Sequence, residues 1–154
     1  MPAVMGAPAT VRGWGGGSGV SVRLVRPRGL DELHRALAAA RSSGGAIARG
    51  LGRSYGDAAQ LSGELVIDTS GLTGFELDEN RGTVTAQAGA TLRELLAALV
   101  PRGWMVPVVP GTQHVTVAGA IAGDIHGKNQ ASRARSGPTW RRSACSPRTA
   151  RCGS

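Results

Sequence analysis

The sequence has few aromatic residues, few cysteines and no long apolar run. Phe, Trp and Tyr together make up 3% of its 154 residues. The two cysteines, Cys145 and Cys152, lie near the end of the sequence, with neither the spacing of a metal site nor that of a disulfide framework. No segment reaches the ~20 apolar residues of a membrane helix, and the N-terminus lacks the apolar run of a Sec signal peptide. We therefore expect no transmembrane segment, no signal peptide and no metal.

Large apolar residues are absent from residues 130–154, which contain no Val, Leu, Ile, Met or Phe. Six arginines and no acidic residue lie there, whereas residues 1–129 carry twelve basic and ten acidic side chains. The net charge of +8 is thus mainly a property of this tail, and the sequence does not favour nucleic-acid binding. We expect residues 130–154 to be disordered. Their Arg, Ala, Ser and Pro bias also predicts a frameshifted, non-native translation.

The rest of the sequence alternates between strand and helix patterns. Residues 1–19 are glycine-rich and are expected to be a flexible lead-in, followed by an incomplete domain over residues 20–129. Hydrophobic periodicity predicts strands at 20–25, 46–49, 64–68, 74–78 and 83–88, and helices at 30–43, 91–100 and 117–121. The apolar face of the first helix is expected to comprise Leu30, Leu33, His34, Leu37 and Ala40. A capping box of Thr91 and Glu94 opens the second helix. The fold class is α+β, without a regular βαβ repeat.

Two glycine-rich segments, residues 48–57 and 110–119, carry the main functional signal. Glycine lets the backbone come close to a ligand, so that several N–H groups can point at one anion. The first segment follows a predicted strand, and the second precedes a helix opened by Thr116. This placement suits an anion held between strand ends and a helix N-terminus.

Other interpretations of these glycines fit less well. Gly50, Gly52 and Gly56 approximate a nicotinamide-dinucleotide fingerprint, but residues 57–63 are too few for the helix that should follow. A Walker-type site would need a Gly-Lys-Ser/Thr sequence, which does not follow the glycines. Glycines that serve only tight turns remain an alternative. We favour a flavin site in which both segments share one pyrophosphate.

Three segments in order, residues 46–57, 104–112 and 120–129, closely resemble the sugar-lipid oxidases among the vanillyl-alcohol-oxidase-like flavoproteins. The resemblance extends from about Gly13 to Asn129. It implies the N-terminal part of a two-lobed, PCMH-type FAD-binding domain. FAD should be bound non-covalently, because Arg53 stands where many superfamily members have the attaching histidine. The implied cofactor contacts are Ala48, Arg49, Gly50, Leu51, Gly52, Arg53, Ser54, Tyr55, Gly56, Asp57, Ala58, Gly111, Thr116, Val117, Ala118, Gly119, Gly123, Asp124, Ile125 and His126.

The resemblance also implies an FAD-dependent oxidoreductase that oxidises the 2-hydroxyl of decaprenylphosphoryl-ribose, on the route to decaprenylphosphoryl-arabinose for cell-wall arabinan. It places His126, Gly127 and Lys128 on the side of this polyprenyl-phosphate sugar, and the catalytic residues in a C-terminal part that is missing here. A separate nicotinamide-dependent reductase would complete the epimerisation. We expect a location at the cytoplasmic or periplasmic face of the cell membrane, with peripheral association at most. Two alternatives stay open: another FAD-dependent sugar or aldonolactone oxidase, and an inactive truncated chain without stable cofactor.

Overall fold

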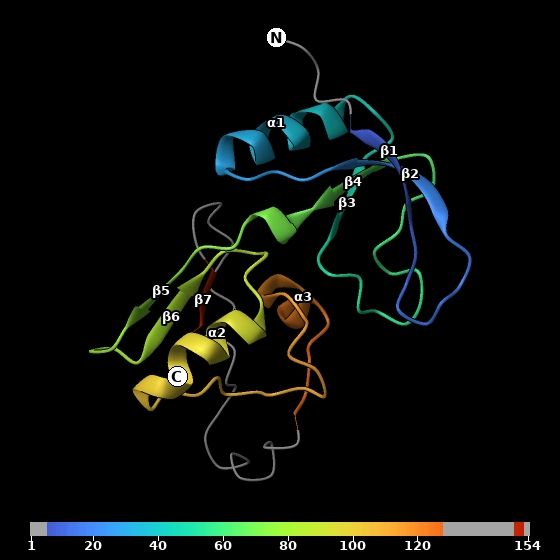
Figure 1. Ribbon diagram of the computed structural model, residues 1–154. Coiled ribbons are helices and arrows are strands. Elements are labelled where there is room, and N and C mark those ends of the chain that lie inside the picture. Colours follow the sequence, from blue (N-terminus) through green and yellow to red (C-terminus); the bar gives the residue numbers. More distant parts are fainter. Residues whose placement is uncertain (1–5, 128–149, 153–154) are drawn as a thin grey trace. The chain divides into compact units, whose positions relative to one another are not determined.

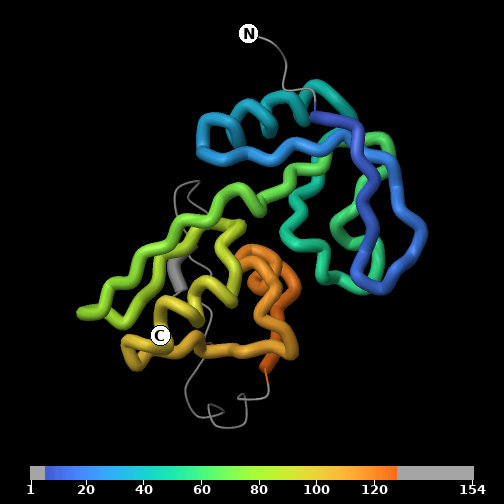
Figure 2. The backbone as a smooth tube through the Cα atoms, viewed as in Figure 1, coloured from blue at the N-terminus to red at the C-terminus, as the bar shows by residue number. Residues whose placement is uncertain are grey.

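The computed structural model describes residues 6–127 and 150–152, which form two units, one up to Leu72 and one from Thr73 onward (Figure 1). Each unit has its own sheet and its own apolar core. Figure 2 follows the backbone through the first unit, in blue to green, and then through the second. No helix among the described residues is long and apolar enough to cross a membrane.

The first unit contains a four-stranded sheet in the order β1-β2-β4-β3. Its strands are β1 (Ala7–Val11), β2 (Val20–Val25), β3 (Ala46–Arg49) and β4 (Leu65–Asp68). Strands β2 and β3 run parallel to β4, whereas β1 pairs antiparallel with β2. All four residues of β4 are buried, as expected for an apolar strand between two neighbours in a covered sheet. The strands expected at 20–25, 46–49 and 64–68 are confirmed to within one residue.

Strand β1 corrects the expectation that all of residues 1–19 form a flexible lead-in. Val11 is its one buried residue, and it pairs with Val20 of β2. Pro8 is tolerated because β1 lies at the edge of the sheet, where a missing N–H can face away from the ladder. Small side chains give this segment little apolar pattern of its own. Its pairing with β2, rather than local periodicity, makes it a strand.

Helix α1 (Leu30–Arg41) is confirmed, but its buried face differs from the expected one. Ala36 and Ala40 are buried and pack with Leu65 and other residues of the sheet, whereas Leu37 is 45% exposed. Small alanines allow the helix to lie close against the sheet, because no long side chain separates the two backbones. Ala40 and Leu33 of the predicted face do make this contact, whereas Ala36 was missed and Leu37 and His34 are exposed.

Asp68 ends β4 and caps the short 3₁₀ helix η1 (Thr69–Gly71). Its carboxylate accepts hydrogen bonds from the Ser70 amide at 2.9 Å and from Nε of Arg26 at 2.7 Å. Burial opposes ionisation of this carboxyl, but the hydrogen bonds from Ser70 and the charge of Arg26 outweigh it and lower the pKa of Asp68. Asp68 is thus a strand-end and capping residue.

We expect Asp68→Asn to lower the free energy of unfolding at neutral pH by about 0.5–1 kcal/mol, because the amide keeps the cap but loses the ion pair with the exposed Arg26. The folded pKa lies below the unfolded value of about 3.9, so the ionic contribution is complete above about pH 5 and is lost as the pH falls through the folded value. Urea unfolding at about pH 7 and about pH 3 measures this. A difference between wild type and variant that did not shrink at the lower pH would contradict the assignment.

The second unit contains an antiparallel sheet and two helices. Its elements are β5 (Phe75–Asp78), β6 (Thr83–Ala86), α2 (Leu92–Leu99), η2 (Val100–Arg102), α3 (Val117–Ala122) and β7 (Ala150–Cys152), with strand order β5-β6-β7. The predicted capping box is present: Oγ1 of Thr91 accepts from the Glu94 amide at 3.2 Å, and the Glu94 carboxylate accepts from the Thr91 amide at 2.8 Å. The strands and helices expected between residues 74 and 122 are confirmed.

The apolar core of the second unit lies between α2, the sheet and α3. Leu92, Leu95 and Leu99 of α2 are buried, as their spacing predicts, and pack with Ala86 of β6 and Val117 of α3. Helix α2 therefore joins the β5-β6 hairpin to the segment that opens α3.

Strand β7 is an exception to the disorder expected over residues 130–154. Ala150–Cys152 pairs antiparallel with β6, with Ala150 opposite Ala86. A free strand edge can add a further strand through main-chain hydrogen bonds alone, so the pairing needs no large apolar side chains. The remainder of this tail lies outside the described residues, and its non-native origin stays a prediction.

Candidate functional site

The first glycine segment starts at the end of β3 and returns to the beginning of β4. Residues 50–64 thus join two parallel strands without a helix, although such crossovers usually contain one. This agrees with the sequence argument against a nicotinamide-type fold. Residues 54–58 of the crossover are exposed. Their backbone is therefore accessible to a ligand.

The backbone amides of this loop are unused by the protein. In residues 6–127 and 150–152, none of the amides from Leu51 through Asp57 donates a hydrogen bond. Several carbonyls of the same loop do accept: Leu51 from Nη1 of Arg53 at 2.7 Å, Ser54 from the Trp14 amide at 2.8 Å. Backbone donors that no protein acceptor uses suit an anion.

The glycines of the two segments differ in what a side chain would meet. A Cβ added at Gly56 or at Gly111 would find no heavy atom within 4 Å. A Cβ at Gly52 would instead collide with the guanidinium of Arg49, and Gly52 has φ of +64°. Gly52 thus serves the packing of the loop itself, whereas Gly56 and Gly111 leave open space that a ligand can fill. Together with the unpaired amides, the open space at Gly56 leaves room for a phosphate group there.

Arg49 and Arg53 both hold the loop through their side chains. The Arg49 guanidinium donates to the carbonyls of Arg12 at 2.6 Å and Ala59 at 3.1 Å. The Arg53 guanidinium lies 4.5 Å from the ring centroid of Trp14. The sequence identified both arginines as cofactor residues but gave Arg12 and Trp14 no role. The glycines around Trp14 were the signal that could have revealed this contact.

The second glycine segment is built differently. Thr116 caps α3, as its position predicts, and its Oγ1 accepts from the Gly119 amide at 3.1 Å. The amides of Val117 and Ala118 donate to the carbonyls of residues 90 and 88, at 2.7 Å and 3.1 Å. The first turn of α3 therefore offers no free amide at these three residues. Their contact with a cofactor stays a prediction and would need other atoms.

Residues 123–126 form the turn that follows α3. The Gly123 amide donates to the Gly119 carbonyl at 2.9 Å, and the Ile125 amide to the Ala120 carbonyl at 3.1 Å. Asp124 has φ of +44°, in the left-handed region that Asp enters more readily than most residues. The turn leaves His126 exposed. Lys128 lies outside the described residues.

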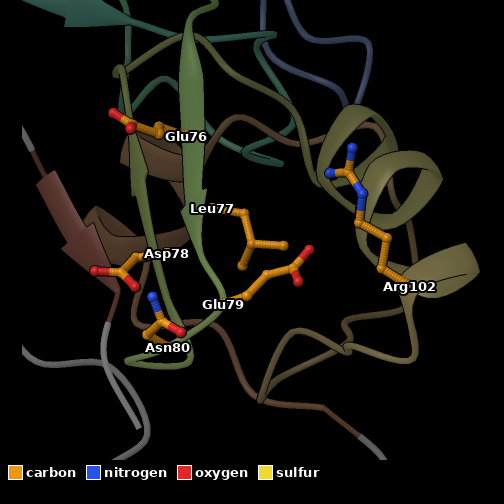
Figure 3. A pocket seen from close by; sticks show the side chains of 6 residues that line it. All are labelled: Glu76, Leu77, Asp78, Glu79, Asn80 and Arg102. Carbon is orange, nitrogen blue, oxygen red and sulfur yellow. The ribbon is translucent and has the colours of Figure 1, made fainter.

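A pocket of about 560 Å³ in the second unit is lined by none of these residues. It is lined by Glu76, Leu77, Asp78, Glu79, Asn80 and Arg102. Figure 3 shows Leu77 and Glu79 pointing toward the side of Arg102, and Asp78 pointing the other way. Its three carboxylates against one guanidinium do not suit an anionic ligand.

A family described as FAD binding domain matches residues 22–135. The chain belongs to this family of FAD-binding domains, which confirms the predicted fold class and FAD as the cofactor that this class of domain binds. The chain is 45% identical over 123 residues to decaprenylphosphoryl-beta-D-ribose oxidase of Mycolicibacterium smegmatis, an alignment that covers 78% of this chain and 27% of the relative. A shorter match, 51% over 39 residues, is to an uncharacterized protein in the mprA 5′ region of Streptomyces coelicolor and covers 25% and 11% of the two chains.

Two kinds of solved structure are also similar. A solvent-stable cholesterol oxidase is 30% identical, with a TM-score of 0.68, over 79% of this chain and 24% of that protein. The BBE-like 1 protein of Physcomitrella patens is 27% identical, with a TM-score of 0.58, over 66% and 23%. The chain thus spans about a quarter of the length of these relatives.

Proposed function

We propose that this chain is the FAD-binding portion of an FAD-dependent oxidoreductase and that the diphosphate of FAD lies on the loop from Leu51 to Asp57. The supporting observation is the run of unpaired amides beside the open space at Gly56. Amide donors can neutralise a diphosphate without any side chain between them and the ligand. Bound FAD would accept the hydride that is removed from an alcohol substrate.

The proposed cofactor contacts comprise the first segment and three parts of the second unit. They are residues 48–58, Gly111, residues 116–119 and residues 123–126. Arg53 is engaged with Leu51 and Trp14, so its role is to shape the loop. Since the amides of residues 117–119 are engaged, the first segment would carry most of the diphosphate contact.

The proposed substrate is decaprenylphosphoryl-ribose, oxidised at its 2-hydroxyl to a keto sugar. Its support is the 45% identity to the oxidase named for that compound, against 30% to a cholesterol oxidase. His126, exposed after α3, with Gly127 and Lys128 would face the substrate. The catalytic residues would correspond to the part of the longer relatives that this chain does not cover. A nicotinamide-dependent reductase would convert the keto sugar into the arabinose epimer, at the membrane face where the lipid resides.

Gly56→Val should raise the dissociation constant for FAD by about tenfold or more, because its side chain would occupy the space assigned to a phosphate. Gly29→Val is the matched control: Gly29 has an extended φ of −161°, its Cβ would also meet nothing within 4 Å, and it lies outside the site. Titration of the chain with FAD, followed by flavin fluorescence, measures both variants. Equal affinity of the two would count against the loop. A wild-type chain without FAD affinity would favour the inactive truncated alternative.

We expect flavin bound by this chain to be released completely by acid precipitation. Arg53 is no site for flavin attachment, and its guanidinium is hydrogen-bonded to Leu51. The measurement is the flavin absorbance of the supernatant and of the washed pellet. Flavin that remained with the pellet would show covalent attachment at another residue.

A further inference from the structure

The connection between β1 and β2, residues 12–19, lies against the first glycine segment. Both loops can be followed in the first unit in Figure 2. The Trp14 amide donates to the Ser54 carbonyl at 2.8 Å, and the Arg12 carbonyl accepts from Nη2 of Arg49 at 2.6 Å. The indole ring of Trp14 covers the Arg53 guanidinium at 4.5 Å. Three separate contacts thus join residues 12–14 to the glycine loop.

The glycines on both sides of Trp14 are required by this contact. A Cβ at Gly13 would collide with the carbonyl oxygen of Gly56, and a Cβ at Gly15 would lie 2.7 Å from the carbonyl oxygen of Tyr55. The two backbones therefore meet directly. Gly17, in the same connection, would gain a Cβ with no heavy atom within 4 Å.

Trp14 contributes little to the apolar core. Its side chain is 57% exposed and belongs to neither buried cluster of the first unit. The loop that it covers has no helix, and none of its amides from Leu51 to Asp57 donates a hydrogen bond within the described residues. Apart from the hydrogen bond of Arg53 to Leu51, its shape therefore depends on contacts from other segments. Losing the Trp14 ring should therefore alter the loop more than the stability of the unit.

We infer that Arg12–Gly15 is a positioning segment, which holds the glycine loop in the shape that receives a diphosphate. This inference rests on the proposed function, because the diphosphate is that of FAD. Trp14 acts through Arg53, and Gly13 and Gly15 let the segment reach the carbonyls of the loop. Neither glycine nor Trp14 needs to touch the cofactor.

The test uses the complete chain and two matched pairs of variants. Trp14→Leu should raise the dissociation constant for FAD by about two- to fivefold, and Trp14→Phe, which keeps an aromatic face, should restore it. Trp104→Leu is the control, since Trp104 is 36% exposed in the second unit and packs on Gly82. Gly15→Ala should raise the constant by about fivefold, whereas Gly17→Ala should leave it unchanged. All variants should remain folded, and the thermal midpoint of each is measured so that a loss of affinity is not mistaken for unfolding.

A second measurement needs no cofactor. Trypsin cleavage between Arg53 and Ser54, relative to cleavage after Arg41, should be faster in Trp14→Leu and in Gly15→Ala than in their controls. FAD affinities equal to those of the controls would overturn the inference. If no variant and no wild-type chain binds FAD, the proposed function fails. In that case the rate of trypsin cleavage after Arg53 decides whether residues 12–15 hold the loop. A rate equal to that of the controls would overturn this part of the inference too. If Trp14→Leu does not fold, Arg53→Met replaces it in the titration, because this variant removes the other partner of the contact between the Trp14 ring and the Arg53 guanidinium.

Discussion

Gly52→Val is expected to abolish FAD binding and to destabilise the first unit by about 2–4 kcal/mol. A side chain at φ of +64° is strained by about 1–2 kcal/mol, and a branched one more than most. Its Cβ would also collide with the guanidinium of Arg49 and so disturb the hydrogen bonds to Arg12 and Ala59. Urea unfolding and FAD titration of the same preparation measure the two effects.

Gly63→Val separates strain from collision in this experiment. Gly63 has φ of +75°, but its Cβ would meet no heavy atom within 4 Å, and it is not among the cofactor contacts. We expect it to lose stability through strain while keeping its affinity for FAD. Gly56→Val should show the opposite, a loss of affinity without loss of stability. If Gly52→Val kept both stability and affinity, the packing assigned to Arg49 would be wrong.

Leu95→Ala should lower the free energy of unfolding of the second unit by about 2–5 kcal/mol. Leu95 is 2% exposed and packs in the cluster that joins α2 to Val117 of α3. Truncation leaves a cavity among residues that cannot all move to fill it. Chemical denaturation measures the loss.

Leu37→Ala is the control for this truncation. Leu37 is 45% exposed on α1, so removing its side chain should change the stability by about 0.5 kcal/mol at most. Equal effects at the two leucines would contradict the burial of Leu95. The cavity left by Leu95→Ala should also loosen the first turn of α3, because Val117 packs in the same core.

The candidate site in the first glycine segment consists of backbone groups and glycines. The unpaired amides and the space at Gly56 follow from a crossover without a helix, and the diphosphate contact proposed for them needs no charged side chain. A site of this kind escapes a search for titratable residues. It is found through its glycines.

Local signals predicted much of the fold. The alternation over 20–25, the leucine face of α2 and the capping box of Thr91 and Glu94 each depend on residues a few positions apart, and the structure has all three. The FAD-binding fold was implied instead by the resemblance of residues 46–57, 104–112 and 120–129 to known flavoproteins, and the family match confirms it. Local patterns of this kind predict which residues are buried or capped, because they do not depend on residues far away in the sequence.

Tertiary contacts decided the features that no local pattern carries. Ala7–Val11 becomes a strand because β2 pairs with it. Helix α1 packs on the sheet through Ala36, Ala40 and Leu33 and leaves Leu37 exposed, which its position in the sequence does not reveal. The sequence marks Gly52 and Gly56 alike as glycines. The Arg49 side chain fills the space beside Gly52 and leaves the space beside Gly56 free. Whether a glycine serves packing or a ligand depends on atoms brought to it by the fold, and its neighbours in the sequence do not contain that information.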